Sequence, residues 1–161
     1  MATKGKGEAR TFAEKILTLW VGVLFLLMLG VELFLPTLMP LLVPGFKTTP
    51  DRLYYAIEFS RITFPFIFFI SLTALYSGML NSIDKFAIVA LSPMVGNMVI
   101  LAIVVGFYDK FCSPGYAFAW GIMCCGILQW LWVWIPSLKE GLGLRFVWPQ
   151  LDKNTKRFFI T

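Results

Sequence analysis

The residues that could do chemistry gather in one stretch, residues 61–86, which is apolar enough to cross a membrane. Ser71 and Gly78 are seven residues apart in it, so they share one face of a helix, and Ser77 lies beside them. A face of small and hydroxyl-bearing side chains either lets a second helix approach closely or lines a polar cavity on a transport path. Helix packing is the ordinary role of such residues, and the cavity is the functional alternative.

Prolines and an amide mark the same region. Pro65 stands near the start of the stretch and would kink its helix, because proline removes a backbone hydrogen bond. The next apolar run repeats the pattern with Pro93, followed four residues later by Asn97. A buried amide in lipid needs a partner, so we expect Asn97 to fasten two helices rather than to bind a ligand.

The chain turns polar between these two runs. Asn81, Asp84 and Lys85 are residue types that cap helices and form tight turns. We therefore expect a helical hairpin here, with a structural role and no binding site.

Little else in the chain supports catalysis. The absence of histidine excludes His-based acid–base chemistry and most zinc sites, and the three cysteines fit no metal or disulfide spacing. There is no glycine-rich phosphate loop and no pair of carboxylates on one face. Glu32 lies either at the lipid headgroups or, as the alternative, inside the membrane as an ion or proton carboxylate. We expect no enzyme, no cofactor and no metal site.

The composition indicates the solvent of this chain. Hydrophobic residues make up 58% of the 161 residues and charged residues only 14%, whereas soluble domains hold about a quarter charged residues. The sequence therefore predicts an all-α membrane protein. The net charge of +5 comes from basic residues at the ends of apolar runs, which argues against a nucleic-acid partner.

Four transmembrane helices are predicted within a single domain spanning 1–161: approximately 12–35, 54–82, 86–108 and 116–138. Prolines after the first helix predict a kinked or unravelled end: Pro36, Pro40 and Pro44. Tryptophans of the last helix predict an aromatic belt near one of its ends: Trp120, Trp130, Trp132 and Trp134.

Residues 139–161 have the pattern of an interfacial tail or linker. With four spans, lysine and arginine are biased ten to four toward the side of the termini. This bias predicts that both termini are cytoplasmic.

The ordered motifs of the second and third runs resemble a known family. The stretch "FSRITFPFIFFISLTALYSGMLNSIDKFAIVALSPMVGNMVILA" is similar to the pattern of the MurJ (MviN) family of lipid II flippases, which act in bacterial cell-wall synthesis. The matching positions are Arg61, Thr63 to Phe66, Ile70 to Ala74, Gly78 to Asn81, Lys85, Phe86, Ala90, Pro93 and Asn97. Residues 117–139 resemble the family's later A-x-A-W, G-x-L-Q and P-x-L-K elements.

The resemblance implies a fold and a function. The family fold is a fourteen-helix exporter bundle of two lobes, belonging to the multidrug/oligosaccharidyl-lipid/polysaccharide exporter superfamily. This chain resembles helices three to six of it, within the N-terminal lobe. The implied activity is alternating access, with lipid II or a related polyprenyl-diphosphate lipid as substrate, in the bacterial inner membrane and together with the remaining flippase helices.

The family's arginines that recognise the lipid diphosphate lie in helices that this chain does not resemble. Arg61 is the nearest substrate-path candidate, with interface anchoring as its alternative role, and the face of Ser71, Ser77 and Gly78 is the second. Two other classes remain open. One is an exporter of another polyprenyl-linked sugar or of drugs from the same superfamily, and the other is a stand-alone tetraspan interaction protein.

Overall fold

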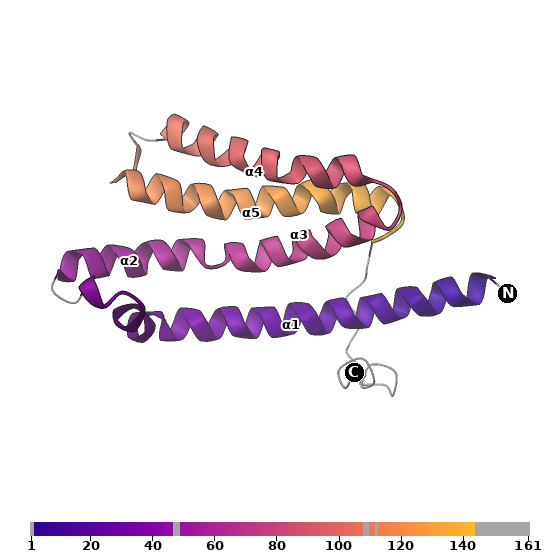
Figure 1. The fold of residues 1–161 in the computed structure, drawn as a ribbon, viewed down its shortest axis with the longest axis horizontal. Coiled ribbons are helices and arrows are strands. Elements are labelled where there is room, and N and C mark those ends of the chain that lie inside the picture. Colours follow the sequence, from indigo (N-terminus) through magenta and orange to yellow (C-terminus); the bar gives the residue numbers. More distant parts are fainter. Residues whose placement is uncertain (1, 47–48, 108–109, 112, 144–161) are drawn as a thin grey trace.

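The chain is helical in the part that the computed structural model describes, residues 2–46, 49–107, 110–111 and 113–143. The helices in chain order are α1 (Ala2–Leu42), the short 3-10 helix η1 (Pro44–Phe46), α2 (Pro50–Thr63), α3 (Phe66–Asn81), α4 (Phe86–Phe107) and α5 (Pro114–Lys139). Figure 1 shows α4 and α5 side by side, α2 and α3 following each other along α5, and α1 on the outer side of α2 and α3. Most of the tail expected over 139–161 lies outside the described residues.

Four segments are long and apolar enough to cross a membrane: Leu17–Leu42, Pro50–Asn81, Phe86–Phe107 and Pro114–Lys139. The second of these contains both α2 and α3. At 32 residues it is about 48 Å long, more than the roughly 30 Å of a hydrocarbon core. The start of α2, with Asp51 and Arg52 exposed, therefore extends beyond the lipid tails.

The interruption between α2 and α3 falls at Phe64 and Pro65. Pro65 has no N–H to donate to the carbonyl of Arg61, so one backbone bond of a continuous helix is missing. The chain resumes its helical bonding at once, because Phe68 N–H donates to the Pro65 carbonyl at 3.1 Å. The two helices thus form one bent span.

The first helix extends beyond its expected end at residue 35. We expected the prolines after that residue to kink or unravel it; it is not unravelled, because α1 remains helical through Pro36 and Pro40 to Leu42. Prolines four residues apart lie on one face of a helix, so the missing bonds are confined to that face while the other faces keep theirs. The helix stops only at Pro44, which begins η1.

Helix α5 is the centre of the bundle, since it packs against α2, α3 and α4. Its contact with α3 and α4 forms a core near the α3–α4 hairpin, where Tyr76, Leu80 and Val133 are buried. The indole of Trp134 donates a hydrogen bond to the Tyr76 hydroxyl, and Trp134 stacks on Trp130 at a centroid distance of 5.2 Å.

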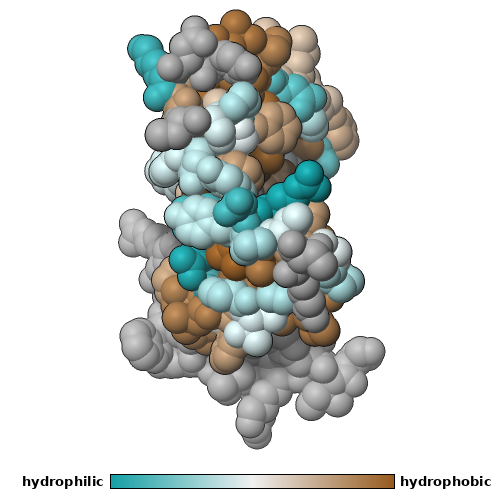
Figure 2. Space-filling view, turned by 90° about the vertical axis from the view of Figure 1, so that its left-hand side faces the viewer, coloured by the Kyte–Doolittle hydropathy of each residue, from teal (hydrophilic) through white to brown (hydrophobic). Residues whose placement is uncertain are grey.

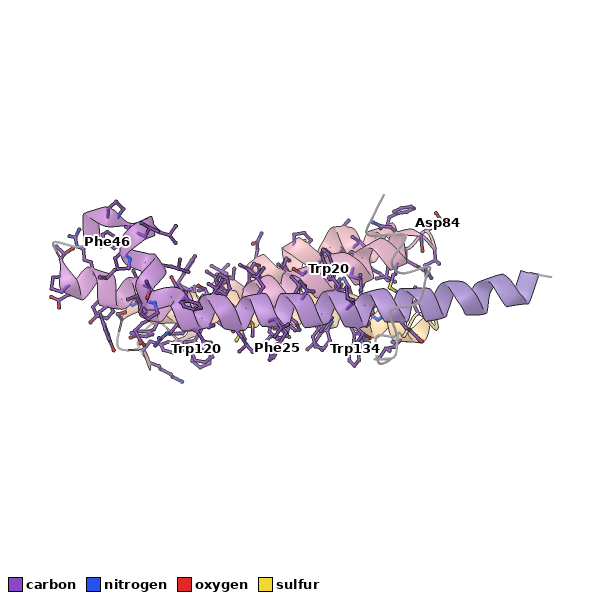
Figure 3. All side chains as sticks on the ribbon, turned by 90° about the horizontal axis from the view of Figure 1, so that it is seen from below. Trp20, Phe25, Phe46, Asp84, Trp120 and Trp134 are labelled. Atoms are coloured by element: carbon purple, nitrogen blue, oxygen red, sulfur yellow. The ribbon has the colours of Figure 1, made fainter. Side chains whose placement is uncertain are left out.

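The aromatic belt expected on α5 is wrong. Trp130 and Trp134 belong to the core, and the N–H of Trp132 donates to the carbonyl of Ile88 on α4 at 3.0 Å. Trp120 lies toward the opposite end of α5, far from Trp134 in Figure 3. Trp130 and Trp134 pack against the core and are therefore not interface anchors, although the buried Nε1 of Trp130 has no hydrogen-bond partner among the described residues.

Helix α2 is held against the start of α5 by aromatic rings. The ring of Phe59 meets that of Tyr116 edge-on at 5.0 Å. Phe59 also lies on Gly115, where a Cβ would come within 2.6 Å of the Phe59 Cε2 atom. This end of the bundle, seen in Figure 2, mixes hydrophilic and hydrophobic side chains as expected at a membrane surface.

Helices α3 and α5 end in the same Schellman motif. After α3, Lys85 N–H donates to the Leu80 carbonyl at 3.0 Å and Asp84 N–H to the Asn81 carbonyl at 3.2 Å. After α5, Leu142 N–H donates to the Ser137 carbonyl at 2.9 Å, with Gly141 in the place of Asp84. The residue in this place is left-handed in both, with φ 60° for Asp84 and 72° for Gly141.

The two ends meet through one ion pair. Lys85 Nζ lies 2.9 Å from Glu140 Oε1, and both side chains are solvent-exposed. An exposed pair of this kind contributes little to stability. The hairpin is therefore held mainly by its backbone bonds and by the core beneath it.

Because only glycine adopts a left-handed conformation without strain, we expect Asp84→Gly to raise the free energy of unfolding by about 0.5–1 kcal/mol. Asp84→Val should lower it by about 1–2 kcal/mol, since a branched side chain is strained there. Thermal unfolding in detergent, followed by circular dichroism, measures both. The matched control is Gly141→Asp, which should be destabilising; equal stability of all four proteins would contradict the assignment.

Candidate functional site

A cavity of about 500 Å³ lies between α3, α4 and α5. It reaches Asn97 of α4, about 16 Å from either end of that helix and hence near mid-membrane. Its described lining carries no charged side chain but five neutral hydrogen-bonding ones: Thr73, Ser77, Ser92, Asn97 and Gln129. The cavity therefore suits hydrogen bonding to a neutral polar group.

Pro93 adds a backbone acceptor to this lining. It has no N–H to give to the carbonyl of Val89 one turn earlier, and both residues line the cavity. Helix α4 nevertheless continues through Pro93 without a break. The exposed Pro93 and Asn97 stand at the margin of the cavity, on one stripe of α4.

Gln129 is the least accessible polar side chain of the lining apart from Ser92 and Thr73. It is 7% exposed, and its Oε1 atom has no hydrogen-bond partner among the described residues. Gly96 of α4 makes room for it: a Cβ on Gly96 would meet the Gln129 amide and come within 2.8 Å of Cys125 Sγ. The close approach of α4 to α5 at this level thus requires glycine.

The face expected on α3 divides between two cavities. Ser77 lines the central cavity, whereas Ser71 lines a smaller one of about 280 Å³ against Trp20 of α1. Gly78 is exposed, and nothing lies within 4 Å of the place where its Cβ would be. Ala74 borders both cavities.

Arg61 lies away from the central cavity, at the C-terminal end of α2. It is exposed, and its guanidinium is close enough to Glu32 of α1 for the two charges to interact. Neither role considered for Glu32 from the sequence involved Arg61. This proximity arises because α1 and α2 are antiparallel neighbours, a relation that residue spacing does not reveal.

Sequence reasoning also missed Gln129, Ser92 and Gly96. Gln129 lies inside an apolar run, and the argument that selected Asn97 applies equally to it. Ser92 and Gly96 carry no signal of this kind, because small residues are common wherever membrane helices pack. The hairpin residues Asn81, Asp84 and Lys85 lie between the end of α3 and the start of α4, and they do not line the cavity.

A family model described as lipid II flippase MurJ matches residues 1–161. The chain is 31% identical over 160 residues to a probable lipid II flippase MurJ of Rhizobium meliloti (strain 1021), covering 97% of this chain and 30% of that protein. A probable lipid II flippase MurJ of Rickettsia prowazekii is 28% identical over 155 residues, which cover 96% and 30%. A lipid II flippase MurJ of Burkholderia cenocepacia is 41% identical over 85 residues, covering 53% and 16%.

The contact at Gly96 generates a prediction. Gly96→Ala should lower the free energy of unfolding by about 1–3 kcal/mol, because the added methyl overpacks against Gln129 and Cys125. The matched control is Gly106→Ala on the same helix, where nothing lies within 4 Å of the added methyl. The control should be as stable as the parent or slightly more so. Thermal unfolding in detergent compares them, and equal melting temperatures would refute the close approach.

Proposed function

The chain belongs to the lipid II flippase MurJ family, and we propose that it forms part of a flippase for undecaprenyl-diphosphate-linked peptidoglycan precursors in the bacterial inner membrane. The observation that carries this proposal is the match of the family model to the whole chain, residues 1–161. The chain spans about 30% of the length of the curated relatives it matches. Transport is accordingly assigned to a longer set of helices, to which this chain contributes four spans.

The chemistry of the chain is consistent with transport. Moving a lipid-linked headgroup across a bilayer requires a polar surface within the membrane, and no covalent bond is made or broken. The central cavity offers neutral hydrogen-bonding side chains at mid-membrane depth. The protein then acts as a transporter by alternating access, with both termini in the cytoplasm.

Arg61 is the proposed contact for the charged part of the substrate. A guanidinium binds diphosphate oxygens through paired, charge-assisted hydrogen bonds. Arg61 is exposed at the C-terminal end of α2, where its guanidinium can be reached from outside the bundle.

The bend at Phe64 and Pro65 supports a conformational role for this span. It separates Arg61, on α2, from Phe66, where α3 begins and the lining of the central cavity starts. A missing backbone bond is a place at which two helical segments can change their relative angle at small cost. We propose that α2 and α3 pivot here as access alternates.

The role of Arg61 can be tested in a chimera in which this chain replaces the matching segment of the Rhizobium meliloti relative, expressed in a flippase-depleted strain. Arg61→Ala should lower lipid II flipping about tenfold or more, because a hydrogen bond to a charged group is lost. Arg61→Lys should keep part of the activity, since the charge remains but the paired geometry does not. Lys110→Ala is the matched control, a basic residue at the same end of the bundle, and should flip normally. Full activity of Arg61→Ala would overturn the assignment.

A second prediction concerns the chain by itself. Liposomes that contain only the 161-residue chain should flip lipid II no faster than empty liposomes, because four spans do not enclose a path for a large headgroup. The intact Rhizobium meliloti relative, reconstituted in parallel, is the positive control. Headgroup translocation by the chain alone would contradict the proposal that it is one part of the transporter.

A further inference from the structure

One face of the bundle combines three features that lipid cannot satisfy. On α3, Ala74 and Gly78 are four residues apart and both exposed. Beside them opens the central cavity, which is bordered on α4 by the exposed amide of Asn97. Within its lining, Gln129 is 7% exposed, and no described residue partners its Oε1.

Lipid tails offer neither donors nor acceptors, so a side-chain amide facing them is unfavourable. Many other exposed positions carry large apolar side chains, which lipid accepts. On α4 the residues pointing outward at similar depth include Met94, Met98 and Leu101, and on α1 they include Leu26 and Leu33. The cavity face is therefore different in kind from the lipid-facing surface of the same helices.

The residues of the face favour a helix as its occupant. Two small residues at a spacing of four let a second helix approach to backbone contact. Gly78 leaves the space that such an approach needs, because nothing lies within 4 Å of its Cβ position. Polar side chains next to a small-residue contact then provide hydrogen bonds between the helices.

We propose that the face formed by Ala74, Ser77 and Gly78, together with the cavity that Gln129 lines, is the docking surface for a further membrane helix of a longer flippase polypeptide. That helix places a hydrogen-bond donor in the cavity. The relatives support this occupant, because the chain covers only 30% of their length. A cavity at mid-membrane depth can be covered only by a segment that itself enters the membrane.

A second copy of this chain is a poorer occupant. The face is concave, and two concave faces brought together would leave their amides apart. The outward faces of α1 and α4 named above carry no donor to place in the cavity. The inference rests on membership of a family of longer chains and not on the transport of any substrate.

The test co-expresses the full chain with the part of the Rhizobium meliloti relative that it does not match, and measures their co-purification from membranes. Gly78→Leu should reduce the recovered complex about tenfold, because it fills the docking space. Gly106→Leu is the matched control, an exposed helical glycine that likewise has nothing within 4 Å of its Cβ position. The control should co-purify normally, and both variants should keep the helicity and melting temperature of the parent chain.

Gln129→Leu separates docking from folding. Replacing an unpartnered buried amide by an apolar side chain of similar size should leave the isolated chain as stable as before or more so. The same substitution should weaken co-purification, because the incoming donor loses its acceptor. A role confined to the fold of this chain would not produce that combination.

Two results would overturn the proposal. One is equal recovery of the Gly78→Leu and Gly106→Leu variants, whether high or low. The other is a dimer of the chain alone, seen by single-molecule photobleaching in liposomes, that Gly78→Leu abolishes while Gly106→Leu does not. The second result would assign the face to a second copy.

Discussion

The structure depends on one constraint: in lipid, each polar group must find its partner within the protein. Several hydroxyl side chains meet this constraint inside their own helix. Ser71 donates to the Ile67 carbonyl at 2.7 Å, Thr73 to the Phe69 carbonyl at 2.9 Å, and Ser137 to the Val133 carbonyl at 2.8 Å. Amide and indole side chains are too long or too rigid to bond to a backbone carbonyl of their own helix. Their partners must come from a neighbouring helix, so these side chains determine where helices pack together.

The packing of α5 follows from that division. The indoles of Trp132 and Trp134 find partners on α4 and α3, at the Ile88 carbonyl and the Tyr76 hydroxyl. Gln129, on the same helix, is brought against α4 only because residue 96 is glycine. Helix α5 carries the polar groups that cannot form hydrogen bonds within their own helix, and it is therefore the central element. The more hydrophobic helix α4 is not, since its mean hydropathy is 2.4 against 1.6 for α5.

Much of the architecture could be predicted from the sequence, because length and hydropathy alone determine whether a helix can cross a bilayer. The all-helical membrane fold was confirmed in this way. The family, expected from the resemblance of the ordered motifs, was confirmed by the family model. The unravelling considered for the end of α1 and the belt of tryptophans near one end of α5 were wrong for a shared reason: both depend on what lies opposite the residue. Pro36 and Pro40 are tolerated on one face, and Trp130 and Trp134 pack inward, yet each residue type by itself predicts the reverse. The interaction of Arg61 with Glu32 and the enclosure of Gln129 were missed for the same cause, since they join helices far apart in the chain.

Burial has a different meaning for this chain than for a soluble domain. Of the hydrophobic windows in the four spans, 6% of residues are buried for the first and 33% for the last. In water such exposure would indicate an unfinished core, but an exposed Leu33 or Met98 is satisfied by lipid tails.

Exposed hydrophobic area therefore cannot identify a protein-facing surface here. Exposed polarity can, because Asn97 is uncompensated in hydrocarbon. An exposed small residue such as Gly78 leaves a neighbouring helix room to approach, but Gly106 does the same, so a small residue is informative only beside a polar group. Where the two coincide, beside Gln129, the surface of this chain is built for contact with protein.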